Sequence, residues 1–186
     1  MNRFLIGFFC IFSLTTGLAA EAAKYSFSQS GSSLKFLNKA SLHGIEGKAK
    51  AFSGTLDTDA LTGVLTVETA EMTTSLGPRD TKMHKFCLES KKFPKISFSV
   101  TGIEGGEALQ AGSGSGKVTL VGKLTIRDVS LPVRVVADFS FTGADLSLKG
   151  RYDFKWTDFN VPDPSIFVST LYPEMNVQFQ LAMTSG

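Results

Sequence analysis

The chain has 186 residues, of which 19% are charged, and a formal net charge of +2. A net charge this small gives no electrostatic footprint for nucleic acid, whose partners usually carry a basic domain or stripe. Phenylalanine, with 16 copies, dominates the aromatic content. It buries a large area without needing a hydrogen-bond partner, which suits an apolar interior.

The first 22 residues predict an export signal. One positive charge, Arg3, precedes an apolar stretch from Phe4 to about Leu18, and small residues follow at Ala19, Ala20 and Ala22. This is the order of segments in a secretory signal peptide. A transmembrane anchor is the rival interpretation, but the apolar stretch is shorter than the ~20 residues that span a bilayer. We therefore expect cleavage near 19–22 and a periplasmic or secreted protein without stable membrane insertion.

Residues 23–186 are enough for one domain of ordinary size. Cys10 lies inside the apolar stretch and lacks the leucine and small residues expected just before a lipidated cysteine. Its loss with the signal leaves Cys87 alone, so no internal disulfide can form. Cys87 could link two chains in a homodimer, but a small buried hydrophobic side chain is the interpretation we favour.

Alternation of apolar and polar residues predicts β-strands along most of the mature chain. It starts at Tyr25 and Phe27 and continues at Leu34 and Phe36. The clearest runs are 65–69, 96–100, 118–126, 131–141, 146–156 and 175–183. Counted in this way there are eight or nine strands. Long neighbouring strands joined by short turns must stack as a sandwich or close into a barrel, and we expect one antiparallel barrel.

The segment 79–92 breaks this alternation. Three of its apolar residues stand at i, i+3 and i+4: Met83, Phe86 and Cys87. This spacing predicts one amphipathic helix, with Asp80 in position to cap its first turn. The helix must end before Pro94, because the residue preceding a proline avoids helical geometry.

Two segments predict loops. Residues 105–116, GGEALQAGSGSG, carry no secondary-structure signal and are expected to form a flexible connection. Residues 157–173 are broken by prolines and are too long for a hairpin.

No catalytic or metal-binding motif stands out. The run GSGSG at 112–116 has glycine where the catalytic pattern G-x-S-x-G needs its central serine. The run does not match the phosphate-binding P-loop pattern either. His43 and His84 lack the clustered partners of a zinc site. Cys87 is three residues from His84, but an apolar helix face raises the pKa of a thiol. We predict no metal, no cofactor and no enzymatic activity.

Four short motifs stand in order along residues 24–183. They are G-x4-F-x-G-x2-D at Gly47–Asp57, Arg79-Asp80 before the helix, Phe93-Pro94-x-Ile96-x-Phe98, and Gly122–Ile126 running on to Pro132-Val133. On these motifs the chain resembles the YceI-like family of secreted, lipocalin-like polyisoprenoid-binding proteins. It departs from the family in two places. Asp128 stands where family members often have glycine, and the proline-rich loop 161–164 replaces the commoner Arg-x-Asp-Phe-Gly.

The resemblance implies an all-β fold, an extended antiparallel eight-stranded lipocalin-like barrel with one inserted amphipathic helix. It also implies a ligand with a long apolar chain: a polyisoprenoid, an isoprenoid quinone or a fatty-acyl compound, held for transport, storage or sequestration. An eight-stranded barrel is just wide enough to hold one small ligand. Burying a prenyl chain there is worth about 25 cal/mol per Å2 removed from water.

The apolar positions of the strands and helix are the candidate cavity lining. They are Phe52, Leu65, Val67, Met83, Phe86, Phe98, Leu120, Leu124, Val135, Phe139, Leu148, Tyr152, Phe154, Val177 and Phe179. The alternative is that they fill the core of a small barrel, since both kinds of barrel share this alternation. Arg79 and Asp80 are candidates for a polar rim that orients a head group, with an ordinary helix-capping ion pair as the alternative.

Three other functions compete with lipid binding. An outer-membrane barrel would show aromatic girdles and a terminal aromatic residue, but this chain ends Leu181–Gly186 and its aromatic residues lie mid-strand. An enzyme acting on a lipid-like substrate would need a polar catalytic constellation. A secreted, stress-related barrel with a filled core would have the same sequence pattern and no ligand.

Overall fold

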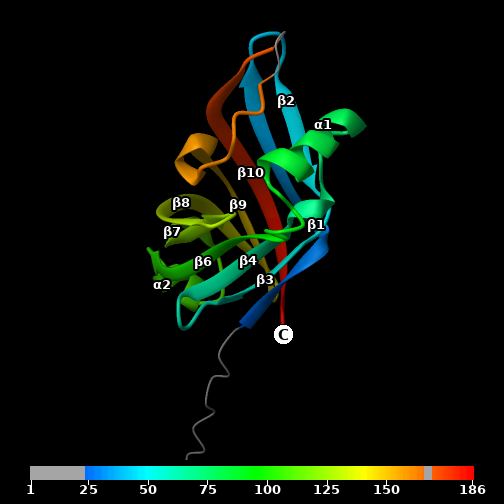
Figure 1. Ribbon diagram of the computed structural model, residues 1–186. Coiled ribbons are helices and arrows are strands. Elements are labelled where there is room, and N and C mark those ends of the chain that lie inside the picture. The colour runs from blue at the N-terminus through cyan, green and yellow to red at the C-terminus, as the bar shows by residue number, and fades with distance from the viewer. Residues whose placement is uncertain (1–23, 166–168) are drawn as a thin grey trace, which may run out of the picture.

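Ten antiparallel strands form one sheet that closes on itself (Figure 1). The computed structural model describes residues 24–165 and 169–186, so the predicted signal peptide lies outside the described residues. The strands are β1 (Lys24–Ala40), β2 (Ile45–Ala49), β3 (Phe52–Asp57), β4 (Thr62–Glu68), β5 (Met72–Thr73), β6 (Lys95–Glu104), β7 (Ser115–Ile126), β8 (Val129–Thr142), β9 (Asp145–Lys155) and β10 (Leu171–Ser185).

Eight of these strands make the closed ring, in the order β1-β3-β4-β6-β7-β8-β9-β10, and β10 pairs back onto β1. The short strands β2 and β5 lengthen the wall at one end, where β2 pairs with β1 and β5 with β2. This arrangement confirms the predicted all-β, eight-stranded antiparallel barrel. No helix in the described part of the chain is long and apolar enough to cross a membrane.

Strand alternation decides which side chains face inward. In β8, Val133, Val135 and Ala137 are buried, whereas the residues between them are exposed. Successive strand side chains point to opposite faces, so one sequence pattern makes a dry inside and a wet outside.

One end of the barrel is closed by packed side chains. The ring of Phe141 makes edge contacts with Tyr25 and Phe139, with centroids 6.1 Å apart in each pair. Leu109, which is fully buried, fills the same cluster from a short helix, α2 (Glu107–Gln110). The prediction of a structureless 105–116 connection is therefore wrong, because burial of Leu109 orders its centre and β7 already begins at Ser115.

The inserted helix is shorter than predicted. It begins as α1 (Gly77–Lys82), continues as a π-helical turn, η2 (Met83–Cys87), and ends well before residue 92. Glu89 takes a left-handed backbone conformation (φ 47°), which stops the helix. Asp80 does not cap the N-terminus, since the residue at that position is Leu76 and makes no side-chain cap bond.

A second apolar cluster fastens the helical segment to the open end of the barrel. Its buried members are Leu88, Ile126 and Phe159. Phe159 belongs to a 3-10 turn, η3 (Trp156–Phe159), and a second such turn, η1 (Thr69–Glu71), precedes β5. The predicted 157–173 loop therefore contains regular structure at both ends, since η3 runs to Phe159 and β10 starts at Leu171.

Candidate ligand cavity

The barrel encloses a cavity of about 580 Å3 between its closed end and the helical segment. Every strand of the closed ring contributes to the wall, and the lining is almost entirely apolar. Pockets that bind small molecules usually measure about 300–1,000 Å3 and have apolar walls with a few polar groups. The interior therefore has the size and chemistry of a ligand site.

Twelve of the fifteen predicted lining residues lie on the cavity wall. They are Leu65, Val67, Met83, Phe98, Leu120, Leu124, Val135, Leu148, Tyr152, Phe154, Val177 and Phe179. The barrel brings them together from seven elements that are far apart in the sequence. Their contact with a ligand stays a prediction.

The other three predicted residues lie outside the cavity. Phe52 and Phe139 point inward but pack in the hydrophobic core, where their side chains are 6% and 3% exposed. Phe86 is 48% exposed on the outer side of the helix. The wider π-helical turn explains this, because it brings Met83 and Cys87 onto the cavity side and turns Phe86 away.

Sequence reasoning missed the part of the wall near the open end. The missed residues include Leu34, Phe36, Asn38, His43, Ile45, Leu171 and Met175. Leu34, Phe36 and Met175 already belong to the alternating runs, and Asn38 and Leu171 continue the same inward positions toward the ends of β1 and β10. His43 follows β1 in a loop and carried no such signal.

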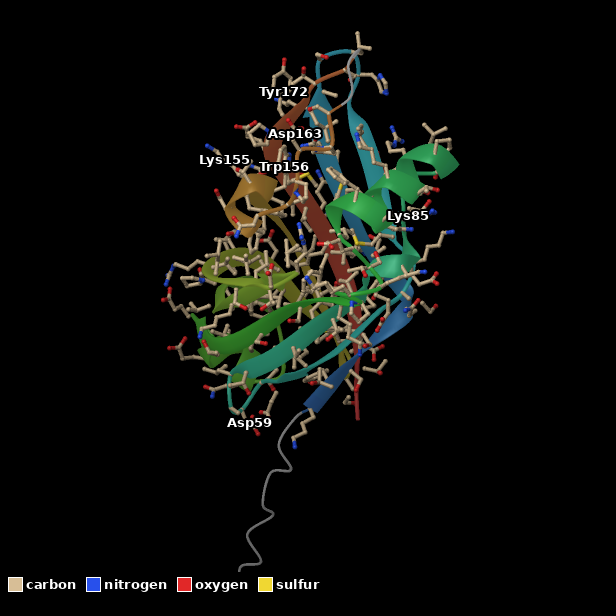
Figure 2. The ribbon with its side chains drawn as sticks, viewed as in Figure 1. Asp59, Lys85, Lys155, Trp156, Asp163 and Tyr172 are labelled. Carbon is tan, nitrogen blue, oxygen red and sulfur yellow. The ribbon has the colours of Figure 1, made fainter. Side chains whose placement is uncertain are left out.

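The mouth of the cavity lies where the helical segment meets the β1–β2 hairpin and the chain after η3. Figure 2 shows Asp163, Trp156 and Tyr172 gathered at the end of the molecule opposite Asp59. Two cationic side chains, Arg79 and Lys82, line this mouth. Lys82 Nζ donates to the carbonyl oxygens of Pro164 and Ser165 at 2.6 and 3.0 Å, which fastens the helix to the late loop.

The predicted rim pair separates into two roles. Arg79 donates from Nε and Nη2 to Thr74 Oγ1 and the Thr74 carbonyl oxygen, at 2.8 Å each. Asp80 lies off the cavity wall and accepts bonds from Thr73 Oγ1 at 2.6 Å and the Thr74 N–H at 2.7 Å. Among the described residues no ion pair joins Arg79 to Asp80, so the helix-capping ion pair is not formed.

These bonds shift the pKa of the Asp80 carboxyl. Burial alone would raise that pKa, but the hydrogen bonds from Thr73 and Thr74 outweigh it and hold the pKa below its usual value of 3.8. The carboxylate therefore stays charged and ties α1 to the end of β5.

Cys87 is a free thiol that lines the cavity and is 8% exposed. Burial raises its pKa above the usual value. His84 Nε2 lies 2.7 Å from the Met72 carbonyl oxygen, so that nitrogen carries the proton and donates it to β5. This arrangement is that of a buried thiol and not of an activated nucleophile.

Metal ligands are not gathered in the described residues, where no group of three or more His, Cys, Asp or Glu side chains could hold an ion. The cavity instead offers apolar surface, with Arg79 and Lys82 at its mouth. Such a site can bind an apolar chain and hold a polar head near the opening.

A closed antiparallel barrel around an apolar cavity defines a lipocalin-like fold. The family can be stated as well. The family model of the YceI-like domain matches residues 25–183, so the chain belongs to the YceI-like family.

Solved structures share this fold at low sequence identity. BcnA from Burkholderia cenocepacia is 22% identical with a TM-score of 0.70, over 84% of this chain and 98% of BcnA. A polyisoprenoid-binding domain from Saccharophagus degradans, implicated in plant cell wall breakdown, is 14% identical with a TM-score of 0.76, over 89% and 100%. The Campylobacter jejuni YceI protein is 18% identical with a TM-score of 0.61, over 76% and 85%. A search of curated proteins found no match.

Proposed function

We propose that this protein is an exported lipid carrier that holds one long apolar chain inside its barrel. The observation that carries the proposal is the apolar cavity of about 580 Å3, whose wall includes residues of the helical segment and of every strand of the closed ring. The ligand classes are a polyisoprenoid, an isoprenoid quinone or a fatty-acyl compound. Family membership and the polyisoprenoid-binding domain among its structural neighbours support this choice.

The hydrophobic effect alone supplies enough free energy for such binding. Each buried CH2 group contributes about 0.8 kcal/mol, so a chain of ten contributes about 8 kcal/mol. The loss of translational and rotational freedom on binding offsets part of this gain. No charged partner is needed along the chain, which agrees with the scarcity of polar groups on the wall.

Export rests on the signal-like segment at residues 1–22. A carrier on the far side of the membrane would shield an apolar chain from water during transport, storage or sequestration. Binding without turnover fits the cavity chemistry, because the thiol of Cys87 is buried and His84 is bonded to the Met72 backbone.

Mass spectrometry of the mature protein, purified without detergent, tests the proposal. The protein is measured natively and after organic extraction. We expect one long-chain isoprenoid, quinone or acyl lipid per chain. A protein with nothing bound that also takes up neither farnesol nor oleic acid would contradict the proposal and favour the filled-core alternative.

Neighbouring residues of β8 provide matched variants for the uptake assay. Val135 lines the cavity, whereas Val136 is 50% exposed on the outer face. Val135→Trp fills the cavity and is expected to weaken farnesol binding by about tenfold or more, since several CH2 groups lose their place. Val136→Trp should bind like the wild type.

Cys87 provides a direct reporter of occupancy. Its thiol lines the cavity, and it is the only cysteine outside the predicted signal. Bound farnesol should slow the alkylation of Cys87 by iodoacetamide in wild type and in Val136→Trp. An alkylation rate that is unchanged at saturating farnesol would place the lipid outside the cavity.

A further inference from the structure

The open end of the barrel combines exposed apolar side chains with an excess of positive charge. We propose that this end docks on the surface of an anionic lipid bilayer, so that the cavity mouth faces the membrane. That docking serves lipid exchange rests on the function proposed above. Docking itself is inferred from the exposed side chains and charges of this surface.

Three of the most exposed apolar side chains surround the mouth: Leu42, Leu76 and Phe86, at 67%, 52% and 48% exposure. Leu76 is part of the cavity wall, and Leu42 precedes His43, which is also on the wall. Phe86 lies next to Lys82 of the mouth, whose Nζ is 5.9 Å from the centre of the Phe86 ring. Leu42 follows β1, whereas Leu76 and Phe86 belong to the helical segment, and all three lie near the opening.

Positive charge is concentrated on the same side. Residues 77–95 hold six Lys or Arg residues and two acidic residues, a net charge of +4, although the whole chain carries only +2. The two acids are engaged within the protein, Asp80 by Thr73 and Thr74 and Glu89 by Arg127. Four of the lysines are exposed: Lys85, Lys91, Lys92 and Lys95, of which Lys95 pairs with Glu68. Lys85 lies on the helical segment in Figure 2.

Asp163, which lies close to Lys82, opposes this charge. Asp163 accepts bonds from Ser165, and these bonds lower the pKa of its carboxyl, so it stays charged. Lys82 lies near it and also acts to lower that pKa. The segment 77–95 still holds more basic than acidic residues. The closed end, marked by Asp59 in Figure 2, is the end that faces away from the bilayer in this arrangement.

Apolar tips beside lysines match the two forces that hold a peripheral protein at a membrane. The apolar side chains enter the boundary between head groups and acyl chains, and the lysines are attracted by anionic head groups. Attraction to the head groups falls as salt is added. Docking through the mouth would let a lipid pass between bilayer and cavity without crossing water.

Vesicle flotation tests the proposal with the mature protein. The vesicles contain phosphatidylcholine, either pure or with a quarter phosphatidylglycerol. We expect association with the anionic vesicles at low salt, release at high salt, and little association with pure phosphatidylcholine. The double variant Leu42→Ser/Phe86→Ser should bind anionic vesicles roughly tenfold more weakly or worse. Val136→Ser, which removes an equally exposed apolar side chain from the barrel wall, should bind like the wild type.

A charge pair completes the test. Lys85→Glu should weaken binding several-fold, on the order of fivefold to tenfold. Lys123→Glu, the same change on the exposed wall of β7, should have a much smaller effect. A wild-type protein that does not associate with anionic vesicles would overturn docking. An equal loss of vesicle binding in the mouth variants and in their wall controls would also overturn it.

Farnesol uptake from water separates this proposal from the proposed function. Leu42 and Phe86 lie off the cavity wall, so Leu42→Ser/Phe86→Ser should still show slower Cys87 alkylation with farnesol. Farnesol uptake without vesicle association would overturn docking alone. Vesicle association without farnesol uptake would overturn lipid carriage and leave docking in place.

Discussion

At the scale of single residues, Arg127 joins three segments that are distant in the sequence. Its guanidinium pairs with Glu89, donates to the Asn160 carbonyl oxygen at 2.9 Å, and lies 5.5 Å from the centre of the Phe93 ring. Arg127, Glu89 and Asn160 all have positive φ, at 56°, 47° and 52°. Each such backbone costs about 1–2 kcal/mol outside glycine, so these contacts offset a strained geometry.

Replacing Arg127 tests this role. Arg127→Met keeps the apolar stem of the side chain and removes the pairing with Glu89. The Arg127 side chain is only 13% exposed in the wild type. We expect the free energy of unfolding to fall by about 1–3 kcal/mol, because the substitution also removes the bond to the Asn160 carbonyl oxygen and leaves the Glu89 carboxylate, 36% exposed, without its partner. Urea unfolding measures the change. Arg134→Met breaks the exposed pair with Glu104 and should have little effect. Equal losses in the two variants would contradict the special role of Arg127.

Asp80 predicts a dependence of stability on pH. Its folded-state pKa is lowered, so its carboxylate stabilises the fold above the unfolded pKa, and this stabilisation is lost as pH falls through the folded pKa. We expect Asp80→Asn to be less stable than wild type near pH 7 and to lose less stability below about pH 4. Urea midpoints across that range measure both effects. Parallel curves for the two proteins would show that ionisation of Asp80 does not support the fold.

At the scale of elements, close strand packing explains one glycine in each of two family motifs. Gly122 lies in β7, where an added Cβ would collide with the Ser99 carbonyl of the neighbouring strand β6. Gly54, in the first motif, would meet the Val64 carbonyl in the same way. Gly54 and Gly122 therefore provide space for neighbouring backbones and do not serve ligand binding directly.

Gly122→Ala should consequently destabilise the barrel by about 2–4 kcal/mol, since backbone and not a flexible side chain blocks the methyl group. Gly102→Ala is the control, because Gly102 lies in the adjacent strand β6 and an added Cβ there meets no atom within 4 Å. Thermal and urea unfolding compare the two. Similar stability in both variants would mean that β6 and β7 move apart at little cost.

At the scale of the whole molecule, pairing of β1 with β10 closes the ring and creates the cavity. A ligand that binds only the closed barrel must stabilise it against unfolding. At a lipid concentration a hundred times Kd the gain is about 2.7 kcal/mol. For a domain of this size each kcal/mol raises Tm by about 2–4 °C.

Farnesol at that concentration should therefore raise Tm by about 5–10 °C in wild type. Differential scanning calorimetry measures the shift, and Val135→Trp should show a smaller one than Val136→Trp. An equal rise in the two variants would mean that farnesol stabilises the protein from outside the barrel.

Much of the fold was predictable because strand alternation is a local property. The pattern predicted the barrel and twelve wall residues, since side chains at alternate positions share a face. It could not separate Phe139 and Phe52, which are used in core packing, from Leu148, which faces the cavity, because all three point inward. The structure also explains why this chain has Asp128 where family members often have glycine. The positive φ of this turn falls on Arg127, so residue 128 needs no glycine.

The amino-acid sequence by itself determined the strands, their inward faces and the presence of one helix, because periodicity and proline or glycine signals act within a few residues. Only the tertiary structure decided that β1 meets β10, that Phe139 and Leu109 close one end, and that Arg79 and Lys82 border the other. These contacts join residues far apart in the chain. Whether inward side chains fill a barrel or leave a cavity depends on how the closed ring spaces them, and no local pattern contains that distance.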